Sequence, residues 1–513
     1  MKKILALILA LCMCIAVLVA CNDTDSTDTD GSTDKQTSAK ETEKETEKDT
    51  EKDTEKDTEK DPEGDETDKG DDTGKVETPD ASVISIGSVA EWEALAKTGD
   101  PDKEDFLNKT VKLTANIDFG KETASTLFKT FAGTFDGGNF TVKGTTASRM
   151  SLLANTLDGA VVKNVTVDGF AKSCPVDGAE NTSVIAANAT TNDVTFENIT
   201  VKNCSIDADK AGAGNKGVGF ILGEAKNINI TAKNITVSAC EITAANKNSS
   251  KIGGVVGYMM SEGLSTFEGI KVDMNTNANG FTGGVVGKSD GVGNLNFSKI
   301  VVKGTFSSPG STGGSEAMGG IFGAKYNEAA AAGESFVKNA FVDVKLYCTS
   351  NSGRSGAIGG YWYKNQNYSA NITIENCYLK GEYSVRKETT MRNRSGGIFG
   401  EYGAKNSTLT LKNVILEAAI DQTWMGSEVT PDVTKLGGND GALIINYGNT
   451  KVDGVLSHTV TASDCYTTIV SKSDGTALEL PEGFTAVTAA QTAGMVTLDE
   501  NGYVKAVNAP AAS

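Results

Sequence analysis

Arginine and aromatic side chains are concentrated in one stretch of this sequence. Four of the five arginines lie there, namely Arg354, Arg386, Arg392 and Arg394. The same stretch holds the run Tyr361, Trp362 and Tyr363. Two guanidinium groups held side by side suit a carboxylate or a sulfate, and exposed aromatic rings suit the flat faces of sugars. We therefore expect a glycan or acidic-polysaccharide contact here. The alternative is that Tyr and Trp occupy half-buried strand surfaces and Arg stacks beside them.

Residues for other kinds of chemistry are scarce. His458 is the single histidine, which argues against a His-based nucleophile triad and against a zinc site. Residues 212–217 match the dinucleotide fingerprint by letter, but they open a strand and not a helix, so we expect no nucleotide site. No basic stripe interleaved with aromatics is present, so we expect no nucleic-acid binding. We predict no catalytic residue, no metal and no cofactor.

Six cysteines follow the N-terminal region: Cys174, Cys204, Cys240, Cys348, Cys377 and Cys465. An even number in an exported protein permits disulfides. However, Cys204 and Cys240 each follow a repeated asparagine by six residues, which predicts that they stack in neighbouring coils. Cysteine is commonly buried as a small apolar residue, so stacked thiols are favoured over a bridge.

The elements that position these residues come from an internal repeat. Glycine-bounded apolar strands, such as residues 253–257, 283–287, 319–323 and 396–400, alternate with strands that follow a polar pair, such as residues 163–167 and 233–237. The repeat length is 30 to 40 residues, typical of a solenoid. The apolar residues alternate with period two and are rich in Val, Ile and Thr, which excludes helical repeats. We predict an all-β, right-handed parallel β-helix of about nine or more coils, whose stacked coils share one core.

One position of the repeat is usually asparagine: Asn164, Asn198, Asn234, Asn339, Asn376 and Asn413. The equivalent positions in the other coils are assigned to Gly269, Lys299 and Asp453. Asparagine tolerates the left-handed backbone conformation of a sharp turn. Stacked asparagine side chains can also form hydrogen bonds to one another along the axis on which the coils stack. The sequence therefore predicts a structural asparagine ladder.

The N-terminal region reads as an export leader and a tether. A basic start, a 16-residue apolar run and the sequence Leu-Val-Ala-Cys at residues 18–21 are typical of a secretory leader. This segment resembles the lipobox leader of bacterial lipoproteins, which implies acylation at Cys21 and a location at the outer face of the cell membrane. Residues 22–80 carry a net charge of −15 and almost no apolar side chains, so we expect a disordered spacer. The rest of the chain is nearly balanced in charge.

The remaining boundaries follow from local patterns. Residues 88–91 have a capping-box pattern and open an apolar helical face that ends near residue 99, which predicts a short helix over the first coil. Residues 496–507 predict a hairpin with an Asn-Gly turn. We divide the chain into a leader (1–20), a lipidated linker (21–80), a capping helix (81–100), a β-helix (101–470) and a C-terminal cap and tail (471–513).

A family resemblance adds to this interpretation. The helix, the strand Leu-Thr-Ala-Asn-Ile-Asp at residues 113–118 and the turn Phe-Ala-Gly-Thr-Phe-Asp-Gly at residues 131–137 resemble the start of bacterial surface proteins with GLUG-type glycine repeats. The resemblance covers about residues 81–460 and implies a pectate-lyase-like β-helix on the cell surface, in a family with many adhesin-like proteins.

Three functions remain open at this stage. The first is a surface-tethered, monomeric, non-catalytic binding or adhesion protein whose partner is a glycan or a surface protein. The second is a polysaccharide lyase or glycoside hydrolase, because this fold class also hosts those enzymes and fold alone does not choose. The third is an envelope spacer without a ligand, which an Arg-Tyr face buried inside the rod would favour.

Overall fold

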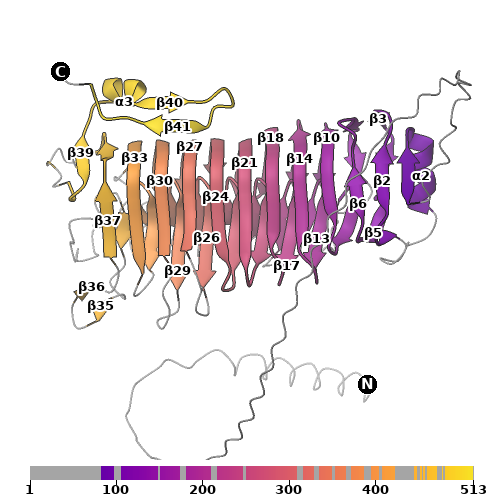
Figure 1. Cartoon of the computed structure of the whole chain (residues 1–513), viewed down its shortest axis with the longest axis horizontal. Helices are drawn as coiled ribbons and strands as arrows, with labels where there is room; N and C mark the ends of the chain where they lie inside the picture. Colours follow the sequence, from indigo (N-terminus) through magenta and orange to yellow (C-terminus); the bar gives the residue numbers. More distant parts are fainter. Residues whose placement is uncertain are drawn as a thin grey trace, which may run out of the picture. The chain divides into compact units, whose positions relative to one another are not determined.

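The computed structural model is built almost entirely from parallel β-strands stacked in coils (Figure 1). The chain divides into residues 1–76 and residues 77–513, and every described residue belongs to the second unit. The structure describes residues 82–97, 106–147, 151–173, 181–209, 216–245, 250–308, 316–327, 334–348, 353–364, 371–385, 394–403, 407–421, 444–446, 451–452, 455–456, 459–470, 477 and 480–511. The predicted leader, Cys21, the predicted linker, Cys174, Arg386, Arg392, Asp453 and His458 lie outside these residues.

Three large sheets run along the stack, and their strands pair only in parallel. The main sheet has 20 strands: β1 (Val83–Ile86), β2 (Thr110–Leu113), β3 (Ile117–Asp118), β4 (Thr123–Ala124), β6 (Thr134–Asp136), β7 (Thr141–Lys143), β8 (Thr146–Ala147), β10 (Val161–Asp168), β11 (Ala171–Ser173), β14 (Val194–Lys202), β15 (Ser205–Asp207), β18 (Ile230–Ala244), β21 (Leu264–Ala278), β24 (Asn294–Ser307), β27 (Glu334–Cys348), β30 (Asn371–Val385), β33 (Thr408–Asp421), β37 (Thr459–Ser463), β38 (Cys465–Thr467) and β39 (Phe484–Ala486).

The other two large sheets supply the shorter strands of each coil. The seven-stranded sheet contains β12 (Thr182–Ser183), β16 (Gly217–Gly219), β19 (Ser250–Gly253), β22 (Gly280–Gly283), β25 (Glu316–Gly319), β28 (Gly353–Gly356) and β31 (Arg394–Ser395). The ten-stranded sheet contains β5 (Phe128–Phe131), β9 (Ala154–Leu157), β13 (Ala186–Thr190), β17 (Leu222–Lys226), β20 (Val256–Met260), β23 (Val286–Asp290), β26 (Phe322–Asn327), β29 (Gly359–Lys364), β32 (Phe399–Gly403) and β34 (Ile444–Asn446). A short antiparallel pair joins β35 (Lys451–Val452) to β36 (Val455–Leu456).

This arrangement is a parallel β-helix, which confirms the predicted fold class. Each coil takes one long strand from the main sheet and one short strand from each of the other two, as in β18, β19 and β20. Side chains that alternate along each strand point inward and stack on their equivalents in the next coil, for example Ile235 on Ile270. They form one continuous buried cluster along the stack. Full burial of such a side chain contributes roughly 1.5–3 kcal/mol.

The repeated asparagines bend the long strands of the main sheet. All six have left-handed backbones, with φ between 50° and 56°. Asn198 Nδ2 donates to Asn164 Oδ1, and Asn234 Nδ2 donates to Asn198 Oδ1, each over 3.0 Å. Asn376 donates to Asn339 over 2.7 Å. Gly269 and Lys299 occupy the equivalent position in the two coils between Asn234 and Asn339, and they also have left-handed backbones.

One expected position of the ladder is wrong. Ser463 of β37 pairs with Lys412, so the residue equivalent to Asn413 is Asp464, whose φ is 53°. We had assigned this position to Asp453. The long segment between β33 and β37 moves the next coil further along the chain than the spacing of the repeat suggests.

The outer face of the main sheet carries two columns of alternating charge. In register order, the first charge column is Lys112, Asp136, Lys163, Glu197, Lys233, Glu268, Ser298, Lys338, Glu375, Lys412 and Ser463. The second charge column is Asp118, Lys143, Asp168, Lys202, Ser238, Asp273, Lys303, Asp343, Lys380 and Glu417. Exposed ion pairs contribute little each, but like charges in these positions would be destabilising. Positive and negative side chains therefore balance each other on this face, and it lacks the continuous positive charge that a polyanion would bind.

Helix α2 (Val89–Lys97) lies at the N-terminal end of the stack (Figure 1). The Ser88 hydroxyl accepts from the backbone of Glu91, and the Glu91 carboxylate accepts from the backbone of Gly87 over 2.7 Å. Trp92 is buried, and its Nε1 donates to the Ser125 carbonyl over 2.8 Å. These contacts fix the helix against the first strands. Its role as a cap stays a prediction.

The C-terminal segment folds back onto the side of the stack. Helix α3 (Ala489–Met495) is followed by the antiparallel hairpin of β40 (Val496–Leu498) and β41 (Val504–Val507), with Gly502 in its turn. Asn376 accepts from Val507 N over 2.9 Å, and Met495 packs with Ile415 and other apolar residues of the outer face. We had expected a cap over the end. Only β39 continues the stack. The rest of the C-terminal segment packs on apolar side chains on the outer face of β30, β33 and β38.

Candidate functional site

The predicted Arg-Tyr site lies at the corner between the seven-stranded and ten-stranded sheets, which we call the crease, where side chains such as Phe281 and Tyr361 form a buried cluster separate from the main core. Glycines form the bottom of this crease. A Cβ at Gly253 would lie 1.9 Å from the Val256 carbonyl oxygen, and one at Gly257 would lie 2.1 Å from Val218 N. Only glycine allows the two sheets to approach so closely. The glycine-bounded motif of the sequence is therefore the corner between the sheets.

Residues seven positions apart face each other across this crease. Lys251 Nζ lies 4.0 Å from the ring centroid of Tyr258, and Lys288 Nζ lies 5.3 Å from that of Phe281. The Arg354 guanidinium carbon lies 4.4 Å from that of Tyr361. The crease is thus lined by cations stacked on aromatic rings, an attractive arrangement that strengthens when the groups are removed from water.

Arg354 is not available to an anionic ligand, which corrects our expectation. Its side chain is 12% exposed and forms an ion pair with Glu401, which is 5% exposed. Burial alone would lower the pKa of Arg354, but the Glu401 carboxylate beside it raises the pKa above the ordinary value. The positive charge is already neutralised within the chain.

Arg394 pairs with Arg354 in the strand register, as the repeat predicts. The side chains of Arg394 and Tyr363 lie outside the described residues, as do Arg386 and Arg392. Tyr361 faces the crease but is only 7% exposed. Trp362 points into the core, is 1% exposed and contacts Phe322 and Phe399 edge-on. Adjacent residues of a strand face opposite sides, so Trp362 presents no surface to a sugar, and this expectation was wrong.

Further along the crease lies a polar network that sequence reasoning missed. The Tyr258 hydroxyl donates to Asp290 Oδ2 over 2.7 Å, and Lys288 Nζ donates to the same oxygen over 2.9 Å. Lys251 is 2% exposed. Burial, followed by the nearby Lys288 charge, lowers the pKa of Lys251 to about 8. The sequence signal for these pairs was the seven-residue spacing across each glycine corner. The two hydrogen bonds of this network lie within the ten-stranded sheet, and the contacts of Lys251 with Tyr258 and of Lys288 with Phe281 join it to the seven-stranded sheet.

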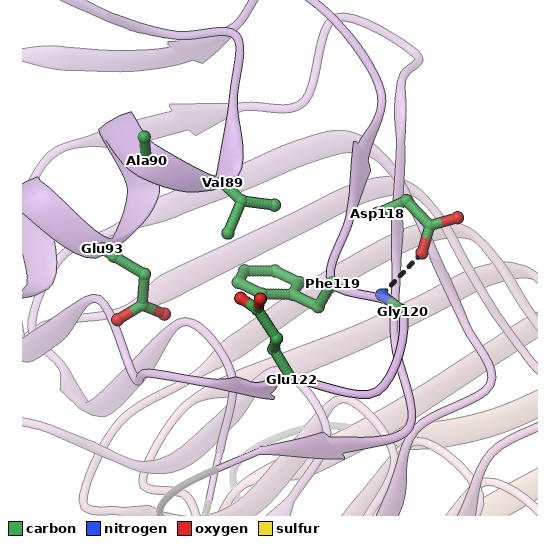
Figure 2. Close-up of a pocket in the computed structure, with 7 residues that line it drawn as sticks. All are labelled: Val89, Ala90, Glu93, Asp118, Phe119, Gly120 and Glu122. Carbon is green, nitrogen blue, oxygen red and sulfur yellow. Dashed lines mark hydrogen bonds between the residues drawn. The ribbon is translucent and has the colours of Figure 1, made fainter.

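A surface hollow of about 580 Å³ lies beside helix α2, and Figure 2 shows the residues that line it. Three carboxylates and one buried ring contribute to its lining, which consists of Val89, Ala90, Glu93, Asp118, Phe119, Gly120 and Glu122. Glu93 accepts from Ser125 N over 2.9 Å and from Ser125 Oγ over 2.7 Å. Asp118 accepts from Gly120 N over 2.8 Å. Two of the carboxylates thus hold local structure, and the acidic lining would repel an acidic glycan.

A second hollow, of about 330 Å³, lies between the tip of the C-terminal hairpin and the main sheet. We call it the hairpin hollow. Its lining consists of Thr236, Val237, Ser238, Lys271, Val272, Asp273, Val301, Lys303, Phe341, Leu498, Asn501 and Gly502. It mixes apolar, hydroxyl and ammonium groups in the way that small-ligand sites do. Asp273 is the one carboxylate in this lining.

The described residues include neither a metal-binding cluster nor a membrane-spanning helix. No group of three or more His, Cys, Asp or Glu side chains there is arranged to hold a metal ion. Neither helix there has the length and apolarity needed to cross a membrane.

The five cysteines in the described part of the chain are free and buried. Four of them follow a residue with a left-handed backbone, and each donates to the carbonyl two residues earlier: Cys204, Cys240, Cys377 and Cys465. Cys204 and Cys240 lie at equivalent positions of adjacent coils, since the residues that follow them, Ser205 and Glu241, pair in register. The thiols are therefore packing residues of the coil corners.

The fold and these sites define a parallel β-helix protein with a hollow beside its C-terminal hairpin. A solved structure from Bacteroides ovatus, described as a putative immunoglobulin A1 protease, is similar to 82% of this chain over 91% of its own length, with 13% identity and a TM-score of 0.31. A likeness at this level carries no argument about what this chain does. No protein-family model matches the chain. No curated protein matches it either.

Proposed function

We propose that this chain is an exported, lipid-anchored protein that binds glycans at the cell surface without cleaving them. In this proposal, Cys21 carries the lipid and residues 22–80 act as the spacer. The β-helix is a rigid support, and the hairpin hollow on its side is the point of ligand contact.

The composition of the hairpin hollow carries the proposal. Its volume is about 330 Å³, at the lower end of the usual range for small-ligand pockets. Hydroxyl, amide and ammonium groups can bond to sugar hydroxyls, and Phe341 and Leu498 provide apolar surface. A glycosidase of the usual kind needs two carboxylates, and Asp273 alone lines the hollow. A binding function therefore fits the hollow better than hydrolysis does.

The test is a binding and cleavage assay with the full chain. We expect retention on immobilised polysaccharides, or a titration signal with their oligomers, and no new reducing ends or unsaturated products with or without calcium. Product formation would overturn the non-catalytic proposal in favour of a lyase or hydrolase. Absence of both binding and product across a broad glycan panel would favour the ligand-free spacer. Labelling with a radioactive fatty acid, compared between the native chain and Cys21→Ala, tests the anchor.

A further inference from the structure

We infer that the hairpin hollow selects a pyranose sugar unit that carries one anionic substituent. This inference rests on the proposed function and deepens it by naming the ligand class. It follows from three features of the lining: two ammonium groups outside the ion pairs of the described residues, one half-buried aromatic ring and the tip of the C-terminal hairpin.

The two ammonium groups belong to Lys271 of β21 and Lys303 of β24, which are strands of adjacent coils. Lys303 belongs to the second charge column, where its register neighbours are Asp273 and Asp343. Two other lysines of that column form ion pairs, Lys202 with Asp168 at 3.4 Å and Lys380 with Glu417 at 3.4 Å. Among the ion pairs of the described residues, none includes Lys271 or Lys303. Two ammonium groups outside these ion pairs therefore line one small hollow, together with the single carboxylate of Asp273.

Both lysines are held by groups around the hollow. Lys271 Nζ donates to Asn501 Oδ1 over 3.3 Å and lies 5.3 Å from the ring centroid of Tyr503. Lys303 Nζ lies 5.6 Å from the ring centroid of Phe341. These contacts are weak compared with an ion pair, so an anion can replace or join them. An ammonium-to-carboxylate hydrogen bond is among the stronger polar contacts in proteins.

The aromatic face belongs to Phe341. One face of its ring stacks on Tyr378 of the next coil, with centroids 5.4 Å apart and planes 20° from parallel. The opposite face is directed toward the preceding coil, where its register partner is the smaller Val301. Val301 and Phe341 both line the hollow, and Lys303 Nζ lies over the Phe341 ring. The negative face of an aromatic ring attracts the positively polarised C–H groups of a pyranose.

The tip of the hairpin limits the size of the site. Leu498, Asn501 and Gly502 at this tip form one side of the hollow. The hairpin is itself anchored by Asn376, whose Nδ2 donates to the Lys505 carbonyl over 3.2 Å and whose Oδ1 accepts from Val507 N over 2.9 Å. One anionic sugar unit at the end or side of a chain fits this enclosure.

The experiment measures binding of the full chain to trigalacturonate by isothermal titration calorimetry. Matched arms use the methyl-esterified trimer, which has the same backbone without charge, and a sulfated galactose oligomer of the same length. We expect binding of the charged trimer and at least tenfold weaker binding of the ester. Comparison with the sulfated oligomer shows whether the site requires a carboxylate or accepts any anionic group. Binding of either anionic oligomer supports the inference.

Two variants test the residues. Lys303→Gln and Phe341→Leu should each weaken binding on the order of tenfold, as expected for loss of one charge-assisted bond or one ring face. Lys202→Gln removes a lysine of the same charge column outside the hollow, and should bind as the native chain does. Lys303 is exposed, so its variant should keep the native circular dichroism spectrum even if Phe341→Leu does not.

The outcomes separate this inference from the proposed function. If glycans bind but the ester binds equally well, or if Lys303→Gln binds like the native chain, the inference is overturned and the proposed function stands. If neither anionic oligomer binds while neutral glycans do, the ligand class is overturned. If no glycan of any class binds, both fail together.

Discussion

The asparagine ladder allows a quantitative prediction from a single position, Asn198. Its side chain donates to Asn164 and accepts from Asn234, both over 3.0 Å, and its φ is 53°. Replacing Asn198 with alanine removes both bonds and places a less tolerant residue in the left-handed conformation. Replacing it with glycine also removes both bonds but accepts this backbone without steric cost.

The expected losses follow from these two terms. A typical hydrogen bond contributes about 0.5–1.5 kcal/mol net, and these bonds are exposed, so the pair contributes about 1 kcal/mol at the lower bound of that range. The left-handed conformation costs an ordinary residue roughly 1–2 kcal/mol. We expect Asn198→Ala to lower the free energy of unfolding by about 2 kcal/mol, and Asn198→Gly by about 1 kcal/mol.

The assay is urea denaturation followed by far-ultraviolet circular dichroism. The expected order of midpoints is native, then Asn198→Gly, then Asn198→Ala. Asn277→Ala serves as the control, because Asn277 is exposed on β21 and is not among the residues with a left-handed backbone; it should lie close to the native midpoint. The reasoning is refuted if the alanine variant is as stable as the glycine variant, or if both match the control.

Two further predictions concern pH and thiol chemistry. Lys251 has a pKa of about 8 in the folded chain against 10.5 for an ordinary lysine, so the unfolded chain binds the proton more tightly. This group therefore lowers the free energy of unfolding fully below pH 8, and the loss disappears as pH rises toward 10.5. Lys251→Met should therefore gain most at pH 7 and progressively less at pH 9 to 10 in denaturation midpoints relative to the native chain; a constant difference across this range would contradict the assignment. Burial raises the pKa of the Cys377 thiol to about 12 and that of Cys465 to about 11, so alkylation at pH 8, followed by peptide mass spectrometry, should leave both unmodified until the chain is unfolded; rapid modification of either in the native chain would show that it is accessible.

Much of the fold could be predicted because the repeat is regular. Glycine corners, period-two strands and Asn positions such as Asn198 and Asn234 recur at steps that fix how the coils stack. The hairpin at Gly502 could be predicted because its turn chemistry is local. These features depend on the neighbours of a residue in sequence or on its equivalent one coil away, and the sequence shows both.

The candidate site could not be predicted because it depends on the side of the strand that each residue faces and on contacts between segments far apart in the sequence. A difference of one residue sends Tyr361 into the crease and Trp362 into the core, and composition alone does not reveal which. The pairing of Arg354 with Glu401 spans 47 residues and joins adjacent coils. The hairpin hollow combines Lys303 and Phe341 with a segment of the chain more than 150 residues away, and only the fold-back of the C-terminal segment brings them together.

The two charge columns restrict how this molecule could have grown by duplication. Because charges alternate from coil to coil, deleting or adding one coil within an alternating run would place two lysines, or two acids, next to each other. A pair of coils can be inserted without that penalty. The neutral residues Ser238 and Ser298 each lie where one alternating run ends and another begins in the opposite phase. The two serines lie in different coils, that of β18 and that of β24, so a single-coil change at either one would keep the alternation in one column and break it in the other.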